Sequence, residues 1–314
     1  MRELVVGTRG SELALWQTRT VMAAVVGPWR EAVIKTAGDR FQEIPLHKAD
    51  AVGLFTKDIE DQLLAGAIDV AVHSMKDLPT RVPPGLAFAA LLERAAPSDV
   101  LLVRPESHDP SRRIPVRPGG LVGASSLRRQ ALLGLWAADL AVASLRGNVP
   151  TRVAKLRKSE CDAIVLARAG ISRLGLDVTP LVAFDLNPEA WVGAPAQGVI
   201  GVQVRASDAE AHQRLAPLDH AESRACAEAE RRLLQLYGGG CHAPFGALVR
   251  RLSSGGVDLH VAVPGEGGYL VERFAADDIA AVEAEAAAWI SSPRAARGRS
   301  KEPSWICRPA QPWC

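Results

Sequence analysis

The sequence has no apolar run approaching the ~20 residues that a membrane-spanning helix needs, so no membrane partner is expected. Its first residues, MRELVVGTRG, run into a strand-like segment and have no signal-peptide pattern. We therefore expect a cytoplasmic protein. The formal net charge is only +2, which argues against a nucleic-acid partner selected by bulk charge.

Cysteine is scarce and irregularly spaced. The five cysteines, at positions 161, 226, 241, 307 and 314, form neither a disulfide framework nor a zinc-ligand cluster, and we expect no metal. The two common glycine-rich motifs that bind nucleotide phosphates are also missing. Carboxylates are therefore the better candidates for an anionic ligand.

Lysine is scarce as well, with 7 lysines against 30 arginines. A coding bias explains the total. At particular positions, however, the planar and always charged guanidinium binds carboxylate or phosphate through two parallel hydrogen bonds, which lysine cannot do. The positions of the arginines therefore matter more than their number.

What the sequence does contain is an alternation of strands and helices over its first two-thirds. Apolar runs such as ELVVGT and DVAVHS alternate with segments of helical periodicity such as SELALWQTRTVMAAVV. This alternation predicts βαβ units and mostly parallel sheets. The last third, with glycine-linked strands, is typical of an α+β domain, and the polar residues 291–314 are expected to be disordered.

Four strand-to-helix junctions repeat one pattern, in which a buried strand precedes a loop with small polar residues and arginine. They are VVGTRGSELALW, VGASSLRRQALL, ASLRGNVPTRVAKL and IVLARAGISRLGL, with Ser11, Ser125 or Ser126, and Asn148 as candidate helix N-caps. Helix starts expose N–H groups that bind anions, and ligands of open α/β sheets bind beyond the carboxyl ends of the strands. The junction arginines therefore predict a cleft for a ligand with several negative charges.

A fifth junction, DVAVHSMKDLPT, places His73, Lys76 and Asp77 after a strand. Asp77 is the one acid at these loops. An aspartate in a turn is common, but among converging arginines it is suited to hold a cationic intermediate and to transfer protons.

The stretch YGGGCHAPFGA, residues 237–247, places Cys241 directly after three glycines. A loop this rich in glycine lets a bulky group approach the backbone closely. From the loop alone, an incidental thiol and a thiol that carries a bound group both remain open.

Eight stretches, in order from about residue 4 to residue 247, together resemble the hydroxymethylbilane synthase (porphobilinogen deaminase) family. They are TRGSELALWQ, GLFTKDIE, AVHSMKDLP, VGASSLRRQ, SLRGNVPTR, DAIVLARAGISRLG, PAQGVIGV and GGGCHAPFG. The resemblance implies two doubly wound, periplasmic-binding-protein-like α/β domains and a small C-terminal α+β domain. The expected ranges are 1–94 with 196–217, 95–195, and 218–290.

The resemblance also implies the chemistry. A dipyrromethane cofactor is attached to Cys241 through a thioether, and four porphobilinogen molecules are joined to it head to tail with loss of ammonia. Water then releases the linear tetrapyrrole hydroxymethylbilane. Each porphobilinogen carries an acetate and a propionate, which explains why the site needs many arginines.

The resemblance assigns roles residue by residue. Asp77 is implied to be the acid–base group and to contact the cofactor. The residues implied to bind cofactor carboxylates are Lys76, Ser126, Arg128 and Arg129. Those implied to contact substrate or cofactor side chains are Arg9, Ser11, Phe55, Arg146, Arg152, Arg173 and Gln197. Asp39 matches a position near the cofactor, and Ala124 stands where the family has threonine.

Two other classes of protein remain as alternatives. An anion-binding receptor on the same fold would need a secretion signal and has no use for the cysteine loop. A hydrolase with Cys241 as nucleophile would need His242 to face the thiol, which adjacent loop residues rarely do. The resemblance favours a monomer that acts on a small molecule, porphobilinogen.

Overall fold

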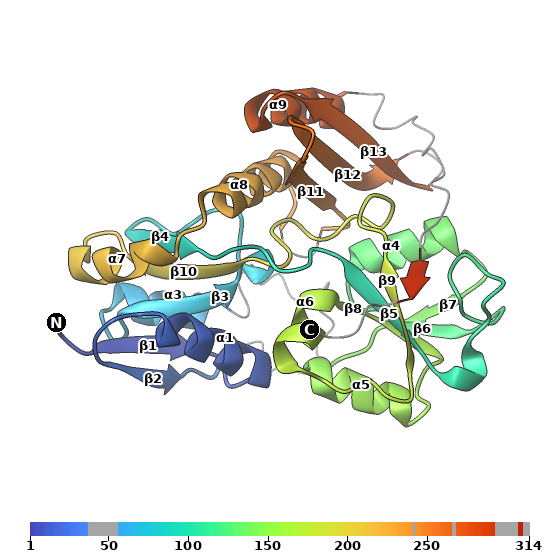
Figure 1. Cartoon of the computed structure of the whole chain (residues 1–314), viewed down its shortest axis with the longest axis horizontal. Coiled ribbons are helices and arrows are strands. Elements are labelled where there is room, and N and C mark those ends of the chain that lie inside the picture. Colours follow the sequence, from blue (N-terminus) through green and yellow to red (C-terminus); the bar gives the residue numbers. More distant parts are fainter. Residues whose placement is uncertain (37–55, 241–242, 266–267, 293–306, 310–314) are drawn as a thin grey trace. The chain divides into compact units, whose positions relative to one another are not determined.

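The computed structural model describes residues 1–36, 56–240, 243–265, 268–292 and 307–309 (Figure 1). The chain divides into two compact units, Met1–Ala95 with Gln197–Glu228, and Ala96–Ala196 with Ala229–Cys314. The predicted division into three domains is finer than this one and remains a prediction. Each unit is described by itself.

The first unit contains a five-stranded sheet with the strand order β2-β1-β3-β10-β4. β1 pairs in parallel with β2 and β3, whereas β10 runs antiparallel to β3 and β4. The strands are β1 (Leu4–Thr8), β2 (Trp29–Val33), β3 (Val70–Ser74), β4 (Leu86–Leu91) and β10 (Ile200–Arg205). The helices are α1 (Glu12–Ala23), α3 (Lys57–Leu64) and α7 (Ala209–Leu215), with the short 3-10 helices η1 (Met75–Asp77) and η3 (Ala216–Leu218).

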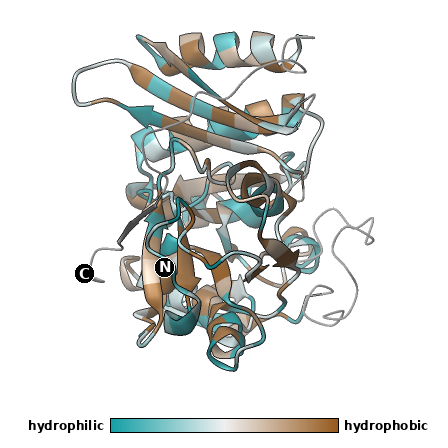
Figure 2. Cartoon of the chain, turned by 90° about the vertical axis from the view of Figure 1, so that its right-hand side faces the viewer, coloured by the Kyte–Doolittle hydropathy of each residue, from teal (hydrophilic) through white to brown (hydrophobic). Residues whose placement is uncertain are grey.

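Helices cover both faces of this sheet because its strands are apolar on both sides. In β1, Leu4 and Val6 pack in the buried cluster that includes α1 and α7, while Val5 packs against the cluster that includes α3. Successive strand residues point to opposite faces, so a strand buried on both sides reads as a continuous apolar run. Figure 2, in which no element is labelled, shows hydrophobic stretches along strands of the chain.

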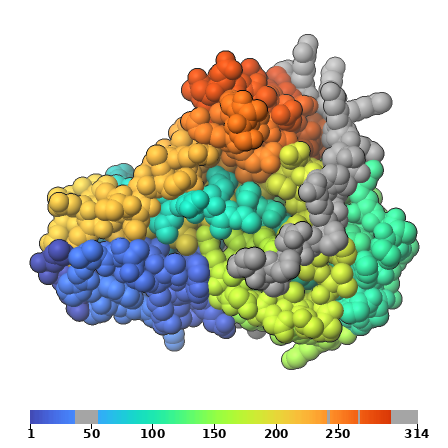
Figure 3. Space-filling model, viewed as in Figure 1, coloured from blue at the N-terminus to red at the C-terminus, as the bar shows by residue number. Residues whose placement is uncertain are grey.

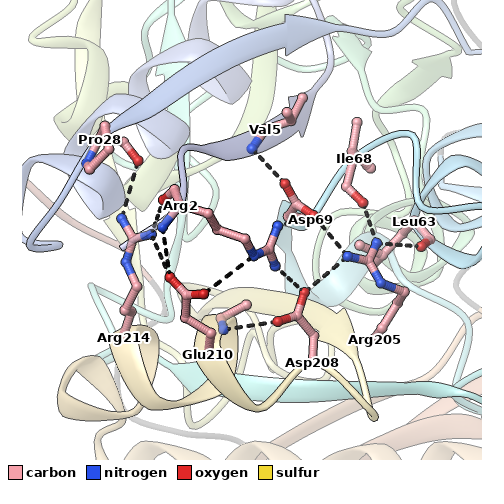
Figure 4. Close-up of polar contacts among 11 residues, drawn as sticks. Arg2, Val5, Pro28, Leu63, Ile68, Asp69, Arg205, Asp208, Glu210 and Arg214 are labelled. Carbon is pink, nitrogen blue, oxygen red and sulfur yellow. Dashed lines mark hydrogen bonds and ion pairs between the residues drawn. The ribbon is translucent and has the colours of Figure 1, made fainter.

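Ion pairs connect the N-terminal residues of the first unit to its later segments (Figure 4). Arg2 contacts the carboxylates of Asp69 and Asp208, and Arg205 donates to the same two carboxylates at 2.8 and 2.9 Å. The Val5 N–H donates to Asp69 at 2.9 Å. In Figure 3 the surface of the first residues accordingly adjoins that of residues near 210.

We expect this network to make the first unit sensitive to acid. Burial alone would raise the pKa of Asp69, but hydrogen bonds from Val5, Arg2 and Arg205 outweigh it and hold that pKa below its ordinary value. A carboxyl whose pKa is depressed on folding stabilises the fold above its unfolded pKa, about 4, and this contribution is lost as the pH falls towards the folded pKa. Asp69→Asn should lower the unfolding temperature at pH 7 and flatten its decline between pH 5 and 3.

Thermal unfolding followed by circular dichroism across this pH range measures the effect. Asp61→Asn is the matched control, because Asp61 is an exposed partner of Lys57 on α3. If Asp69→Asn and Asp61→Asn give the same pH profile as the unaltered protein, the network contributes nothing to acid stability.

The second unit contains a six-stranded sheet of order β14-β9-β5-β8-β6-β7 and a three-stranded antiparallel sheet of order β11-β12-β13. The strands are β5 (Asp99–Val103), β6 (Leu121–Gly123), β7 (Ala141–Ala143), β8 (Ala163–Ala167), β9 (Val182–Leu186), β11 (Gly246–Arg251), β12 (Val257–Gly265), β13 (Gly268–Ala276) and β14 (Cys307–Pro309). The helices are α4 (Leu127–Trp136), α5 (Val149–Arg157), α6 (Arg168–Leu174) and α9 (Ile279–Ile290), with η2 (Pro105–Ser107). Helix α8 (Ala221–Leu236) begins in the first unit and ends in the second.

Part of the C-terminal tail is ordered, which differs from the sequence-based expectation of disorder over residues 291–314. Residues 307–309 form β14, which pairs antiparallel with β9 and extends that sheet by one edge strand. Backbone pairing with an exposed sheet edge places few demands on the sequence that supplies the strand. Side-chain periodicity therefore gave no sign of it.

The two sheets of the second unit share one hydrophobic core. A single buried cluster contains Leu101 of β5, Trp191, Leu248 of β11 and Tyr269 of β13. Helix α9 packs on β12 and β13 (Figure 1) and buries Val282 against them.

The two larger sheets have the same arrangement of strands. In the first unit β1 lies between its parallel neighbours β2 and β3, and in the second β6 lies between β7 and β8. Each sheet also contains one inserted antiparallel strand, β10 or β5. Two α/β sheets with helices and a smaller α+β part confirm the predicted fold class.

Candidate active site

In each unit the strand order reverses at one strand, β1 in the first and β6 in the second. Ligands of open α/β sheets bind outside the carboxyl ends of the strands at such a reversal. In the first unit these ends lead into Arg9–Ser11 and into Met75–Asp77. In the second they lead into Ser125–Arg129 and into α6. The junctions singled out from the sequence therefore lie at the ligand-binding edge of each sheet.

The junction after β1 is built as the sequence predicts. Ser11 is the N-cap of α1, and its hydroxyl accepts a hydrogen bond from the N–H of Ala14 at 3.3 Å. Farther along α1, the buried Gln17 donates to the hydroxyl of Ser74, at the end of β3, at 2.9 Å. This bond fixes the end of β3 relative to the helix that follows β1. Arg9 is partly buried between these two junctions.

Asp77 and Lys76 are presented by the single turn η1, which is anchored through Met75. The side chain of Met75 is fully buried, and its N–H donates to the carbonyl of Val199 at 3.0 Å. This side chain fits only because residue 201 is glycine. A Cβ at position 201 would clash with the sulfur of Met75. With Met75 held, Lys76 is partly buried and Asp77 is exposed to solvent.

His73, the other titratable residue of this junction, is not suited to proton transfer near neutral pH. Burial, which outweighs a hydrogen bond with Gln203, and the nearby charge of Arg9 together lower its pKa to about 4. The imidazole is therefore neutral at pH 7 and cannot serve as an acid there. Asp77, three residues beyond β3, is the carboxylate that this junction exposes.

In the second unit, Arg128 and Arg129 both bind the carboxylate of Asp99, the first residue of β5. Arg128 Nη2 lies 3.0 Å from Oδ2, and Arg129 donates from Nε at 3.0 Å to Oδ2 and from Nη2 at 2.7 Å to Oδ1. The other ends of the two guanidiniums donate to the carbonyls of Val192 and Val165 at 2.7 and 3.0 Å. We call Asp99, Arg128 and Arg129 the arginine cluster.

The arginine cluster carries more positive charge and more donors than its protein partners use. The side chains of Asp99, Arg128 and Arg129 are 0%, 3% and 8% exposed, and their formal charges sum to +1. The two guanidiniums have ten N–H donors, of which five are used in the bonds just described. Arg128 Nε is buried and has no partner among the described residues. Buried charge without a partner is costly, so this donor set fits an anionic group.

The N-cap residues of α4 and α5 differ in whether their side chains make a capping hydrogen bond. Ser126 is the N-cap residue of α4, but its side chain makes no capping hydrogen bond. The hydroxyl of Ser125 instead bonds with the backbone of Leu145. Asn148 caps α5 as predicted, accepting from the N–H of Thr151 at 2.9 Å. The hydroxyl of Ser126 is therefore not required by its own helix.

The remaining predicted arginines of this unit lie before α5, within α5 and in the last turn of α6. Arg146 precedes α5, and Arg152, within its first turn, donates to the carbonyl of Gly147 at 2.7 Å. Arg173 lies on α6, and burial lowers its pKa to about 10. It remains charged at neutral pH, and a partly desolvated cation is a strong partner for a carboxylate.

Cys241, Phe55 and Asp39 lie outside the residues that the structure describes, but both ends of the cysteine loop are defined. Before the cysteine, the Gly240 carbonyl accepts from the N–H of Ala243 at 2.9 Å. After it, the Tyr269 hydroxyl donates to the carbonyl of Pro244 at 3.0 Å. Gly246 then enters β11, where a Cβ would lie 3.0 Å from the Val192 carbonyl oxygen. The residues at both ends of the loop are thus held by contacts within the second unit.

A buried glutamate on α8 holds the entry to β11. Glu230 is 0% exposed, and its two carboxylate oxygens accept from the N–H of Ala196 at 2.6 Å and from that of Val249 at 2.8 Å. Ala196 has a φ of +59°, which few residues other than glycine adopt. It directly precedes Gln197, the predicted pocket residue, which is 1% exposed.

The structure thus places the predicted residues in two groups, one in each unit. Arg9, Ser11, Lys76 and Asp77 gather at the edge of the first sheet. Ser126, Arg128, Arg129, Arg146, Arg152 and Arg173 belong to the second. Sequence reasoning missed Asp99, Trp191 and Glu230. Asp99 could have been found as the acidic first residue of the apolar strand DVLLV. A carboxylate buried in such a strand needs hydrogen-bond donors as partners.

Two sheets that each present serine, arginine or lysine at a ligand-binding edge define an α/β protein for a small polyanionic ligand. Among the described residues, no group of three or more His, Cys, Asp or Glu could hold a metal ion. None of the helices in the described part is long and apolar enough to cross a membrane.

Comparisons with known proteins identify the family. The model described as "Porphobilinogen deaminase, dipyromethane cofactor binding domain" matches residues 4–213. Porphobilinogen deaminase from Syntrophomonas wolfei is 43% identical over 253 residues, covering 79% of this chain and 81% of the relative. That from Desulforudis audaxviator is 45% identical over 255 residues, covering 79% and 80%. The GlnP substrate-binding domain 2 of Lactococcus lactis aligns with a TM-score of 0.40 and 8% identity, covering 76% of this chain and 91% of that one.

The chain belongs to the porphobilinogen deaminase family. It is a transferase that condenses porphobilinogen into hydroxymethylbilane on a covalently bound dipyrromethane cofactor, as its sequence implied. This confirms the predicted family, activity and cofactor.

Proposed function

We propose that the two groups of residues divide the reaction between them. The arginine cluster, with Ser126 and Lys76, binds the carboxylates of the cofactor, and Asp77 transfers protons at the reacting pyrrole. Arg9, Ser11, Arg146, Arg152, Arg173, Gln197 and Phe55 bind the side chains of cofactor and incoming substrate. The observation that supports this best is the arginine cluster, with a charge of +1 and an Arg128 Nε to which no described residue bonds.

The donor chemistry of the second unit fits a polycarboxylate. A planar guanidinium held at one edge presents its remaining N–H groups in a fixed plane, which matches the two oxygens of a carboxylate. The start of α4 adds the partial positive charge of its free backbone N–H groups. The Ser126 hydroxyl, not engaged in capping, supplies a further donor.

The first unit supplies the acid–base group. Asp77 is exposed at the carboxyl end of β3 on a turn that Met75 anchors. Ammonia leaves more easily from a protonated amine, and a proton must later leave the attacking pyrrole carbon. A carboxylate that carries each proton in turn accelerates both events, and its negative charge stabilises the positive charge that develops between them. His73, which lies four residues earlier and is neutral at pH 7, cannot act as the acid.

Cys241 is the attachment point of the cofactor in this proposal. When bound, the dipyrromethane supplies the terminal pyrrole whose free carbon is the nucleophile for the first substrate. The three preceding glycines have no side chains that could obstruct a bulky group on the cysteine. The hydrogen bonds of Tyr269, Glu230 and Gly240 hold both ends of the loop.

We propose further that the protein acts as a monomer in the cytoplasm and binds no nucleic acid. The formal net charge of +2 gives no long-range attraction to a polyanion. Size-exclusion chromatography at micromolar concentration tests the monomer directly, and a stable dimer there contradicts it.

Intact-mass spectrometry of the purified protein tests the function. We expect an added mass of two linked pyrroles, and peptide mapping should place it on Cys241. Cys241→Ser should abolish both the added mass and the production of hydroxymethylbilane, because the thioether cannot form. Cys226→Ser is the control, since Cys226 is a buried thiol on α8. An unmodified Cys241 in a protein that also fails to react with porphobilinogen overturns the proposal.

A further inference from the structure

Asp99 links several donors of the second unit. Its carboxylate accepts from Arg128 and Arg129, as described above, and also from the indole Nε1 of Trp191 at 3.0 Å. Oδ2 thus accepts three N–H groups, and Oδ1 accepts one. Both Asp99 and Trp191 are 0% exposed.

The two arginines cannot hold their positions without such a carboxylate. They occupy the first turn of α4, where the partial positive charge of the helix start repels a cation. Their guanidiniums are also almost fully removed from water. The one carboxylate compensates one of two positive charges and fixes the plane of each guanidinium by hydrogen bonds. Two backbone carbonyls, of Val192 and Val165, complete the orientation.

Trp191 in turn fixes the carboxylate. Its ring is fully buried in the core that joins the two sheets of the unit, so the indole N–H has a fixed direction. The adjacent residue, Val192, provides the carbonyl that accepts from Arg128. The segment 191–192 therefore orients the arginine cluster through one donor and one acceptor.

We propose that Asp99 is a positioning residue for the cofactor, with Trp191 as its support. Asp99 occupies the Nε–Nη2 edge of Arg129 and one Nη of Arg128, which leaves Arg128 Nε and the remaining Nη donors to receive a ligand carboxylate. Without this carboxylate the two guanidiniums repel each other and lose their common orientation. This inference rests on the proposed function, in which Arg128 and Arg129 bind the cofactor.

Asp99→Asn tests the inference, because asparagine keeps the size of aspartate and loses its charge. We expect the fraction of purified protein that carries the two-pyrrole mass to fall, and the rate at which added porphobilinogen completes the loading to fall by about tenfold or more. Both are measured by intact mass and referred to the amount of folded protein. Trp191→Phe keeps a buried ring and removes one hydrogen bond to Oδ2, so its loading should slow by about threefold.

The matched control is Asp185→Asn. Asp185 on β9 binds Arg168 with two hydrogen bonds of 2.9 and 3.0 Å, an ion pair of the same kind in the same sheet and separate from Arg128 and Arg129. We expect this variant to lose stability but to load at the rate of the unaltered protein. This comparison separates positioning from a purely structural effect.

The outcomes are distinct. If Asp99→Asn folds and loads as fast as the unaltered protein, or if Asp185→Asn slows loading equally, Asp99 is not a positioning residue. If Asp99→Asn does not fold, the loading rate of Trp191→Phe tests the inference instead. A Trp191→Phe variant that loads as fast as the unaltered protein overturns it. Failure of the unaltered protein to acquire the adduct contradicts the proposed function itself.

Discussion

Asp77→Asn is expected to reduce the rate of hydroxymethylbilane formation by about 10²–10⁴-fold, the range that a positioned acid–base group contributes. Asparagine keeps the shape of the side chain and one acceptor oxygen but cannot carry a proton. Because Asp77 is exposed at the end of η1, the substitution should leave the unfolding temperature nearly unchanged. The rate is measured under saturating porphobilinogen with protein that carries the adduct.

A second acid in the same unit provides the control for Asp77. Asp61 is exposed on α3 and pairs with Lys57, so Asp61→Asn should change neither turnover nor adduct formation. If Asp77→Asn retains turnover within about tenfold of the unaltered enzyme, far less than a positioned acid–base group supplies, another group transfers the protons. Asp77 would then have only a binding role.

Glu230→Ala is expected to give a large loss of stability. It removes a fully buried carboxylate and leaves the N–H groups of Ala196 and Val249 without an acceptor. Each unsatisfied buried donor costs about 1–3 kcal/mol, so we expect a loss of about 2–5 kcal/mol. At about 2–4 °C for each kcal/mol in a large domain, the unfolding temperature should fall by roughly 4–20 °C.

Glu228→Ala, two residues earlier on α8, is the control for this effect. Glu228 is half exposed and pairs with Arg224 within the helix, and an exposed pair of this kind contributes well under about 1 kcal/mol. Glu230→Gln retains one acceptor oxygen and should give an intermediate loss. Equal unfolding temperatures for the alanine variants at 228 and 230 contradict the assigned role of Glu230.

Much of the local structure could be predicted because it depends on neighbours in the sequence. Ser11 and Asn148 cap their helices as expected, since a cap needs only a side-chain oxygen next to the first turn. Ser126 occupies the N-cap position of α4, but its side chain makes no capping hydrogen bond. The sequence does not distinguish such a serine from one that caps its helix. The inserted antiparallel strands β5 and β10 were also not predicted, because strand direction is set by pairing with distant segments.

The partners of the buried charges were not predicted for a related reason. Glu230 lies among Cys226, Ala227, Leu233 and Leu234, all buried on one side of α8. A charged residue at the centre of an apolar stripe indicates that it has a hydrogen-bonding partner in the core, but the sequence does not show which residue that partner is. The N–H groups that it binds belong to residues 34 positions before and 19 positions after it.

Residue type and short spacing were enough to predict the family, the alternation of strands and helices and the junctions that carry the polar side chains. The folded chain was needed to show that Asp99 accepts from Trp191 and the two arginines of α4. It was also needed to show that Glu230 accepts from Ala196 and Val249, and that β14 pairs with β9. Contacts of this kind join segments far apart in the chain. They form only when the hydrophobic core brings those segments together and burial makes every polar group there require a partner.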